Sequence, residues 1–161
     1  MVTLDDSRAL LRHTLATVAY RGVKSVSDAP AGFADFRVAE GSRTPAEILA
    51  HIGDLFDWGL SLANGKQRWQ DSTPLEWNEA ITRFFDAIRK LDERLGNAEP
   101  LGCPAANLFQ GPIADALTHI GQLAMLRRLA GGPVRAENYF KADIAAGRVG
   151  PEQSRPKVEF G

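Results

Sequence analysis

The chain has 161 residues, a formal net charge of −1 at pH 7 and 44% hydrophobic residues. This length suits about one domain, and the near-average composition excludes intrinsic disorder of the whole chain. Without a basic excess, a nucleic-acid partner is not expected. Charges break every apolar stretch before the ~20 residues that span a bilayer, which argues against a membrane partner. The early charges and the single cysteine, Cys103, lead us to expect a cytoplasmic protein.

Most glycines and prolines fall in three segments, residues 22–45, 96–112 and 131–161. The four long stretches between them have the periodicity of amphipathic helices. We therefore predict an all-α protein built as a four-helix bundle. It would form a single domain over residues 1–161, with residues 133–161 as a C-terminal satellite or tail.

The first predicted helix covers about residues 4–20, whose apolar side chains recur at helical spacings. The second begins after Thr44, which can cap it. Pro45 fits the first helical position, and Glu47 stands where a capping box requires an acidic residue. Asn64 and the glycine after it supply the end of this helix.

The third predicted helix repeats this start pattern with Thr73 and Pro74, continues with apolar residues spaced alternately by 4 and 3, and ends at Gly96. The fourth begins at residues 111–112, a Gly-Pro pair, and ends at residues 131–132, a Gly-Gly pair. Its last turn carries cations, which a helix C-terminus favours: Arg127 and Arg128.

The connections leave the order of the helices open. The link 65–73 is short and suits antiparallel neighbours, whereas 23–43 and 96–110 are long enough to cross an end of the bundle. Both up-down-up-down and crossed connectivities are compatible with these lengths.

The last thirty residues differ from the rest of the chain. Residues 136–146 are predicted to form a short helix with Tyr139, Phe140 and Ile144 facing the body. Residues 147–161, with two prolines, are predicted to be an extended tail.

Two of the three histidines lie at informative positions. His51 lies at the edge of the apolar stripe of the second helix. Asp115 and His119 are four residues apart on the fourth, so their side chains lie on one face, with Cβ atoms about 5–6 Å apart. Two imidazoles and a carboxylate are the ligand set of open catalytic zinc and iron sites. The alternative is a hydrogen-bonded histidine beside a surface ion pair. We interpret Cys103 as structural, because no cation cluster lowers its pKa.

Two segments are recognisable: "TPAEILAHIGDLFDW", which carries His51, and "DALTHIGQLAMLRRLAG", which carries His119. Over residues 4–131 the chain resembles the DinB/YfiT-like superfamily of metal-dependent enzymes. The resemblance implies a bacterial protein, an up-down-down-up four-helix bundle, a divalent metal at one end, and a homodimer.

By this resemblance His51 matches the first metal ligand and His119 the last. The ligand between them is commonly histidine in the family, and here it is Asp115. The resemblance implies nickel or zinc, and the harder carboxylate also admits iron or manganese. Family members with known activity include S-transferases that use bacillithiol or mycothiol. We therefore expect a low-molecular-weight thiol as cosubstrate, together with a small-molecule substrate.

Four further residues are candidates around this site. Gln122 and Asp54 are placed to orient the imidazoles, although both are equally compatible with solvent-facing positions. Trp58 and Tyr139 are expected to line the mouth, although an aromatic residue on a helix is more often part of the core.

Three functions remain open. The first is a metal-dependent enzyme, a thiol-dependent S-transferase or a hydrolase with an open metal site. The alternative is a non-catalytic, stress-related bundle that binds a metal or a small ligand. The third is an interaction protein that has kept the fold without the chemistry.

Overall fold

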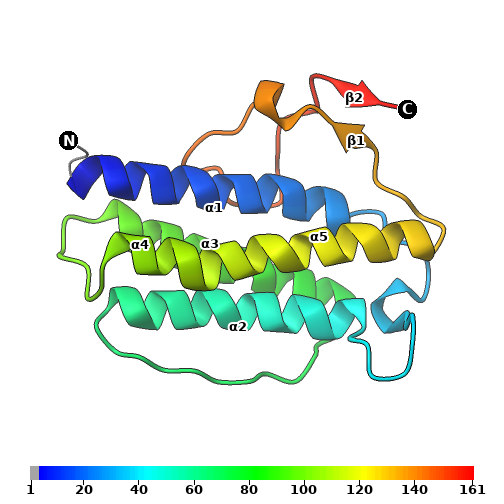
Figure 1. Ribbon diagram of the computed structural model, residues 1–161, viewed down its shortest axis with the longest axis horizontal. Helices are drawn as coiled ribbons and strands as arrows, with labels where there is room; N and C mark the ends of the chain where they lie inside the picture. Colours follow the sequence, from blue (N-terminus) through cyan, green and yellow to red (C-terminus); the bar gives the residue numbers. More distant parts are fainter. Residues whose placement is uncertain (1–3) are drawn as a thin grey trace.

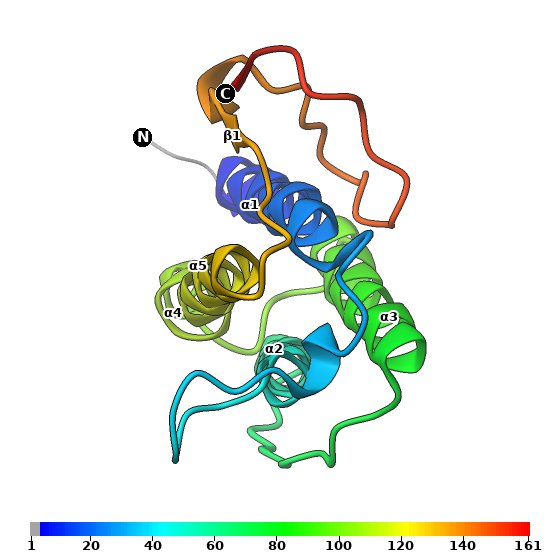
Figure 2. The ribbon, with the colours of Figure 1, turned by 90° about the vertical axis from the view of Figure 1, so that its right-hand side faces the viewer.

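The computed structural model describes residues 4–161, and 58% of the chain is helical. Within these residues lie four long helices: α1 (Leu4–Val26), α2 (Pro45–Ala63), α3 (Trp77–Gly96) and α5 (Ala114–Leu129). They pack side by side with their long axes roughly aligned (Figure 1). Seen along the helices, α1 and α2 lie at opposite corners, and α3 and α5 lie between them (Figure 2).

The core fills the space between the four helices with aliphatic and aromatic side chains. Phe84 of α3 is fully buried against Phe56 of α2, with ring centroids 6.3 Å apart. Burial of one such side chain stabilises the fold by about 1.5–3 kcal/mol. A Cβ on Gly22 of α1 would lie 2.7 Å from the Phe84 ring, so this glycine allows α1 and α3 to approach. The first helix runs through Gly22 and ends at Val26, six residues beyond the end predicted near Tyr20.

The start of α2 is as predicted. The Thr44 hydroxyl accepts from the backbone N–H of Glu47 (3.2 Å), and the Thr44 N–H donates to the Glu47 carboxylate (2.7 Å). This reciprocal pair is the capping box, and Pro45 occupies the first helical position. The helix ends at Ala63, one residue before Asn64.

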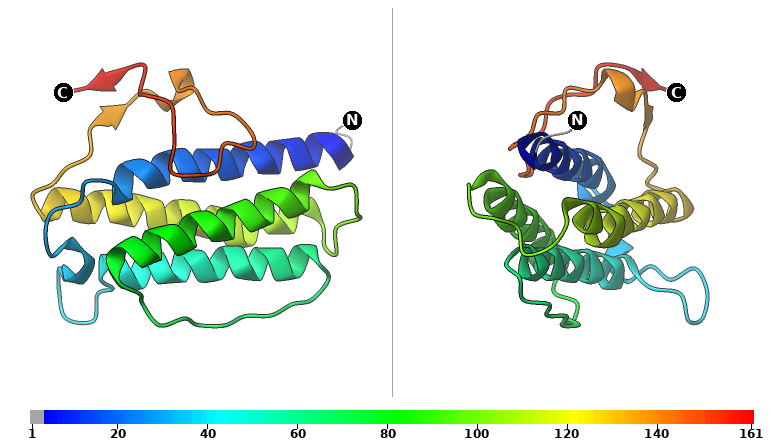
Figure 3. Two further views of the ribbon diagram at one scale, coloured as in Figure 1. Left: turned by 180° about the vertical axis from the view of Figure 1, so that it is seen from behind. Right: turned by 60° about the vertical axis from the view of Figure 1, so that its left-hand side comes forward.

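The predicted start of α3 at Thr73 is wrong. The helix begins at Trp77, and the Glu76 carboxylate caps it by accepting from the next backbone N–H groups. The backbone N–H of Ser72 instead donates to the carboxylate of Asp54 on α2 (3.0 Å). This hydrogen bond holds the segment before α3 in an extended conformation. Residues 64–76, which we call the strap, follow the length of α2 as a non-helical trace (Figures 1 and 3).

The helical stretch that contains α5 begins before the Gly-Pro pair at 111–112, and α5 itself begins after it, at Ala114. Short α4 (Ala105–Leu108) leads into a π-helical turn, Phe109–Ile113, which runs directly into α5. Proline has no N–H to donate and crowds a regular α-helix. The wider π-helical turn accommodates Pro112 inside a continuous helical stretch.

The predicted helix over residues 136–146 is also wrong. The protein is mostly helical, but it also contains a small two-stranded sheet. Strands β1 (Ala136–Glu137) and β2 (Glu159–Phe160) pair antiparallel, with a 3₁₀ turn at Tyr139–Lys141 between them. Phe140, expected to face the body, is 96% exposed. The tail lies over α1 (Figures 1 and 2).

A buried carboxylate accounts for the extended tail. Glu137 accepts hydrogen bonds from the Tyr20 hydroxyl (2.5 Å) and the Lys24 ammonium (2.8 Å), both on α1. A buried carboxylate is costly unless it is paired in this way. These contacts fix the backbone at β1 and override the weak helical pattern. Across residues 4–161, no helix has both the length and the hydropathy needed to cross a membrane.

Candidate metal centre

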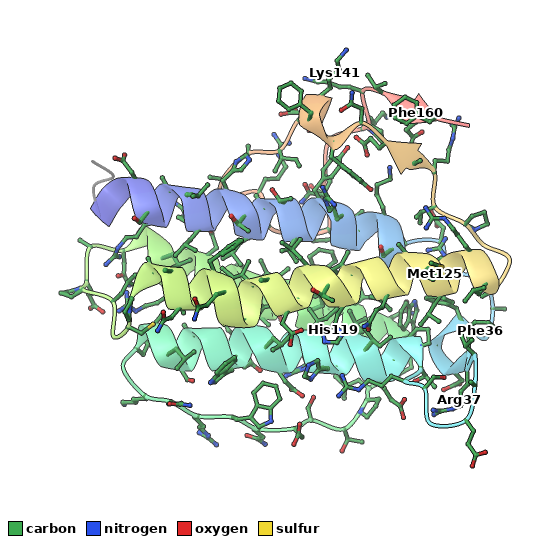
Figure 4. The ribbon with its side chains drawn as sticks, viewed as in Figure 1. Phe36, Arg37, His119, Met125, Lys141 and Phe160 are labelled. Carbon is green, nitrogen blue, oxygen red and sulfur yellow. The ribbon has the colours of Figure 1, made fainter. Side chains whose placement is uncertain are left out.

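The three side chains singled out in the sequence meet between α2 and α5. His51 comes from the middle of α2, and Asp115 and His119 from the first two turns of α5. The two helices pack against each other, which brings residues 64 or more positions apart into one cluster. Figure 4 shows His119 pointing into the space between these helices.

The polar atoms of this cluster lie close enough to one another that they could share one ion. His119 Nε2 lies 3.4 Å from Asp115 Oδ1, and His51 Nε2 lies 3.7 Å from Asp115 Oδ2. Two ligands of a tetrahedral zinc ion, each 2.0–2.1 Å from the metal, are about 3.3 Å apart. The observed separations exceed those of hydrogen bonds. One ligand atom from each residue can be chosen so that all lie within 4.8 Å of one another, so the cluster could hold a metal ion.

The cluster is sheltered on the imidazole side and open on the carboxylate side. The side chains of His51 and His119 are 19% and 12% exposed, whereas that of Asp115 is 48% exposed. Their rings stand nearly perpendicular with centroids 4.7 Å apart. Three ligands with one open side leave coordination positions for a small molecule.

Gln122, a candidate for orienting an imidazole, contacts His119. Its side-chain oxygen lies 2.8 Å from His119 Nδ1. A carbonyl oxygen only accepts, so Nδ1 is the donor in this contact, and Nε2 is the ring nitrogen that faces Asp115. A hydrogen bond of this kind fixes the tautomer and ring plane of a metal-binding histidine.

The environment of His51 favours its neutral form. Burial lowers the pKa of its imidazole, and electrostatic interactions with Arg43 and His119 lower it further. Asp115 and Asp54 act in the opposite direction without reversing the shift. Neutral imidazole is the form that binds metal ions.

Sequence reasoning missed Trp69, which comes from the strap. Its indole ring lies 5.6 Å from the His51 ring and 5.8 Å from that of Trp58, edge to face in both cases. Trp58, expected at the mouth, contacts Trp69, which in turn contacts His51. Trp69 stands in a stretch without periodicity, and only the course of the strap places it over α2.

Two other candidates lie elsewhere. Asp54 is buried and accepts from Arg83 of α3 (2.8 Å) and from the Ser72 backbone, so it fixes α3 and the strap instead of an imidazole. Tyr139, expected at the mouth, packs on α1, its ring 6.3 Å from that of Tyr20 and 4.0 Å from the Arg21 guanidinium. The buried Glu137 beside it fixes this position.

An open pocket of about 400 Å³ adjoins the cluster. It is lined by five residues: Ser42, Arg43, Ile48, His119 and Gln122. Two of them, Ser42 and Arg43, precede the Thr44 cap of α2, in a part of the loop where the sequence showed no motif. Cys103 lies outside this lining, and burial raises the pKa of its thiol. It therefore has the character of a structural cysteine.

Comparison of the chain with family models, with curated proteins and with solved structures finds no match. The resemblance to the DinB/YfiT-like superfamily therefore stays a prediction, and the function is inferred from the geometry of the site.

Proposed function

We propose that the protein is a metal-dependent enzyme that uses His51, Asp115 and His119 to hold a divalent ion. The observation that carries this proposal is the convergence of the two Nε2 atoms on one carboxylate, at 3.4 and 3.7 Å. A surface ion pair would need only one of the imidazoles. The second, drawn from another helix, favours a shared ion.

A divalent ion at an open site supplies Lewis acidity and lowers the pKa of a bound thiol or water. The chain's own residues do the remaining work. His51 and His119 would hold the ion through their ring nitrogens, and Asp115 through its carboxylate. Gln122 keeps His119 in the required tautomer, and Trp69 covers His51 on the strap side. Nickel or zinc are the proposed ions, with iron or manganese admitted by the carboxylate.

The proposed reaction is the transfer of a low-molecular-weight thiol to a small electrophilic substrate, or hydrolysis of that substrate. Among the described residues at or near this site, none is an activated nucleophile. The hydroxyl of Ser42 is occupied by Ala39, to whose carbonyl it donates (2.7 Å), and burial raises the pKa of the Cys103 thiol. This supports a nucleophile that arrives as a cosubstrate.

The finer features implied by the resemblance belong to the same proposal: a bacterial, cytoplasmic homodimer of up-down-down-up order. The course of the strap along α2 supports the helix order, because such a link returns the chain to the end where α2 began. The exposure of Met125 and Leu129 on α5 supports a dimer.

The test combines metal analysis with a thiol-transfer assay. The purified protein is expected to bind about one divalent ion per chain. With bacillithiol, mycothiol or cysteine, it should conjugate monochlorobimane at least about tenfold faster than chelator-treated protein. In this reaction the thiolate sulfur bonds to the carbon that carries chlorine, chloride leaves, and the thiol proton passes to the buffer.

The possible outcomes separate the three functions. A stoichiometric metal without rate enhancement by any thiol or hydrolysis of model esters would leave the non-catalytic, stress-related binding protein as the better interpretation. No bound metal at all would leave an interaction bundle.

Gln122→Ala is expected to weaken zinc binding about 10- to 100-fold, since it removes the acceptor that fixes His119. Competition with a chromogenic chelator measures the affinity. Gln153→Ala, a change of the same kind in the tail, is the control and should leave the affinity unchanged. An unaltered affinity in Gln122→Ala would show that the 2.8 Å contact does not position the ligand.

A further inference from the structure

The pocket beside the candidate metal centre contains an arginine that the proposed chemistry does not use. Arg43 lines this pocket together with His119 and Gln122. His119 is also one of the three residues of the cluster, so Arg43 and the cluster share this pocket.

Arg43 lacks a protein partner within residues 4–161. Arg43 is exposed, and no carboxylate or hydrogen-bond acceptor among those residues pairs with its side chain. Arg37, from the same loop, is different because it donates to the Ser42 carbonyl and to Glu47. Glu47, which also completes the capping box with Thr44, is thus engaged elsewhere.

The pocket lining has one cation and no acidic residue. Asp115, the carboxylate of the metal cluster, is not part of this lining. A guanidinium presents a rigid fork of N–H groups that matches a carboxylate with two parallel hydrogen bonds. Ile48 adds an apolar wall beside it, which suits the short carbon skeleton of a small acid.

We propose that Arg43 binds a carboxylate of the small molecule that the metal centre acts on or takes as cosubstrate. The ligand class is a small organic acid whose other functional group reaches His51 and His119. This inference rests on the proposed function and names its ligand class. Arg43 is then a specificity-determining residue.

The test compares a thiol acid with its methyl ester, which lacks the negative charge and carries one more methyl group. Protein loaded with Co²⁺ is titrated with 3-mercaptopropionate and with its methyl ester, and the thiolate-to-metal absorption band reports binding. We expect the acid to bind about 10- to 100-fold more tightly than the ester, as a charge-assisted hydrogen bond implies. Arg43→Gln should abolish this preference, and Arg43→Lys should keep part of it.

Arg128→Gln is the matched control. Arg128 is an exposed arginine on α5 outside the pocket lining, so its loss removes the same charge but should keep the preference. If Arg43→Gln keeps the preference for the acid, another group binds the carboxylate and the inference is wrong. Equal losses in Arg43→Gln and Arg128→Gln would also overturn it, because net charge alone would then explain the effect.

Failure of this inference can be told from failure of the proposed function. Bound metal is counted in every variant, and Arg43→Gln should retain about one ion per chain. If the wild-type protein binds no metal, the proposed function fails, and the same titration is followed on metal-free protein by the backbone NMR shifts of His119 and Gln122. An Arg43-dependent preference for the acid in that experiment would support the carboxylate site alone, and its absence would refute it.

Discussion

Replacing His51 or His119 by alanine is expected to weaken zinc binding at least about a hundredfold. The binding free energy of a structural zinc site, about 10–16 kcal/mol over four ligands, corresponds to such a loss for each ligand removed. Both Nε2 atoms face Asp115, so no neighbouring imidazole can replace the missing one. Competition with a chelator gives the affinity, and metal analysis after gel filtration gives the stoichiometry.

His13→Ala is the matched control, because His13 is the one histidine of the sequence outside the cluster and lies exposed on α1. It should bind zinc like the wild type. Circular dichroism should show the same helical content for all variants. Wild-type affinity in His51→Ala would refute a site shared between α2 and α5, since Asp115 and His119 lie on one helix and would then suffice.

Arg127→Met is expected to lower the free energy of unfolding by about 3 kcal/mol and Tm by about 6–12 °C. Arg127 is buried, and its guanidinium donates to the carbonyls of Ser25 (3.1 Å), Ser27 (2.8 Å) and Asp28 (3.2 Å). Ser25 lies in the last turn of α1, and Ser27 and Asp28 follow the helix end, where carbonyls lack partners within the helix. Methionine keeps much of the apolar stem and removes the donors. Urea unfolding of the metal-free protein gives the free energy.

Arg128→Met tests whether the effect is local. Arg128 is the next residue on the same helix, but it is exposed. Its loss should change the stability by less than about 0.5 kcal/mol. A similar loss in both variants would attribute the effect to charge at the end of α5, and a loss below about 1 kcal/mol in Arg127→Met would show that water replaces the donors.

Arg127 and Arg128 show that position in a helix does not predict which side chain is buried. Both stand in the last turn of α5, where the helix dipole favours cations equally. Only the packing of α1 against α5 buries one of them and gives it three carbonyls to bind. The strap is a similar case: Thr73 and Pro74 form a reasonable helix start, but the bond from Ser72 to Asp54 holds that stretch extended.

The sequence by itself determined the features whose partners lie within about four residues. These are the helical periodicity, the capping box at Thr44 and Glu47, and the shared face of Asp115 and His119. Such features depend on hydrogen bonds and side-chain spacings inside one helix, and these are fixed by the local chain.

Only the tertiary structure decided which side chains meet across the bundle. It placed His51 beside Asp115, laid Trp69 over His51, and left Arg43 in the pocket without a partner. These contacts depend on how α2, α5, the loop before α2 and the strap pack against one another. No local pattern encodes that packing, because the core side chains that set it are contributed by the whole chain.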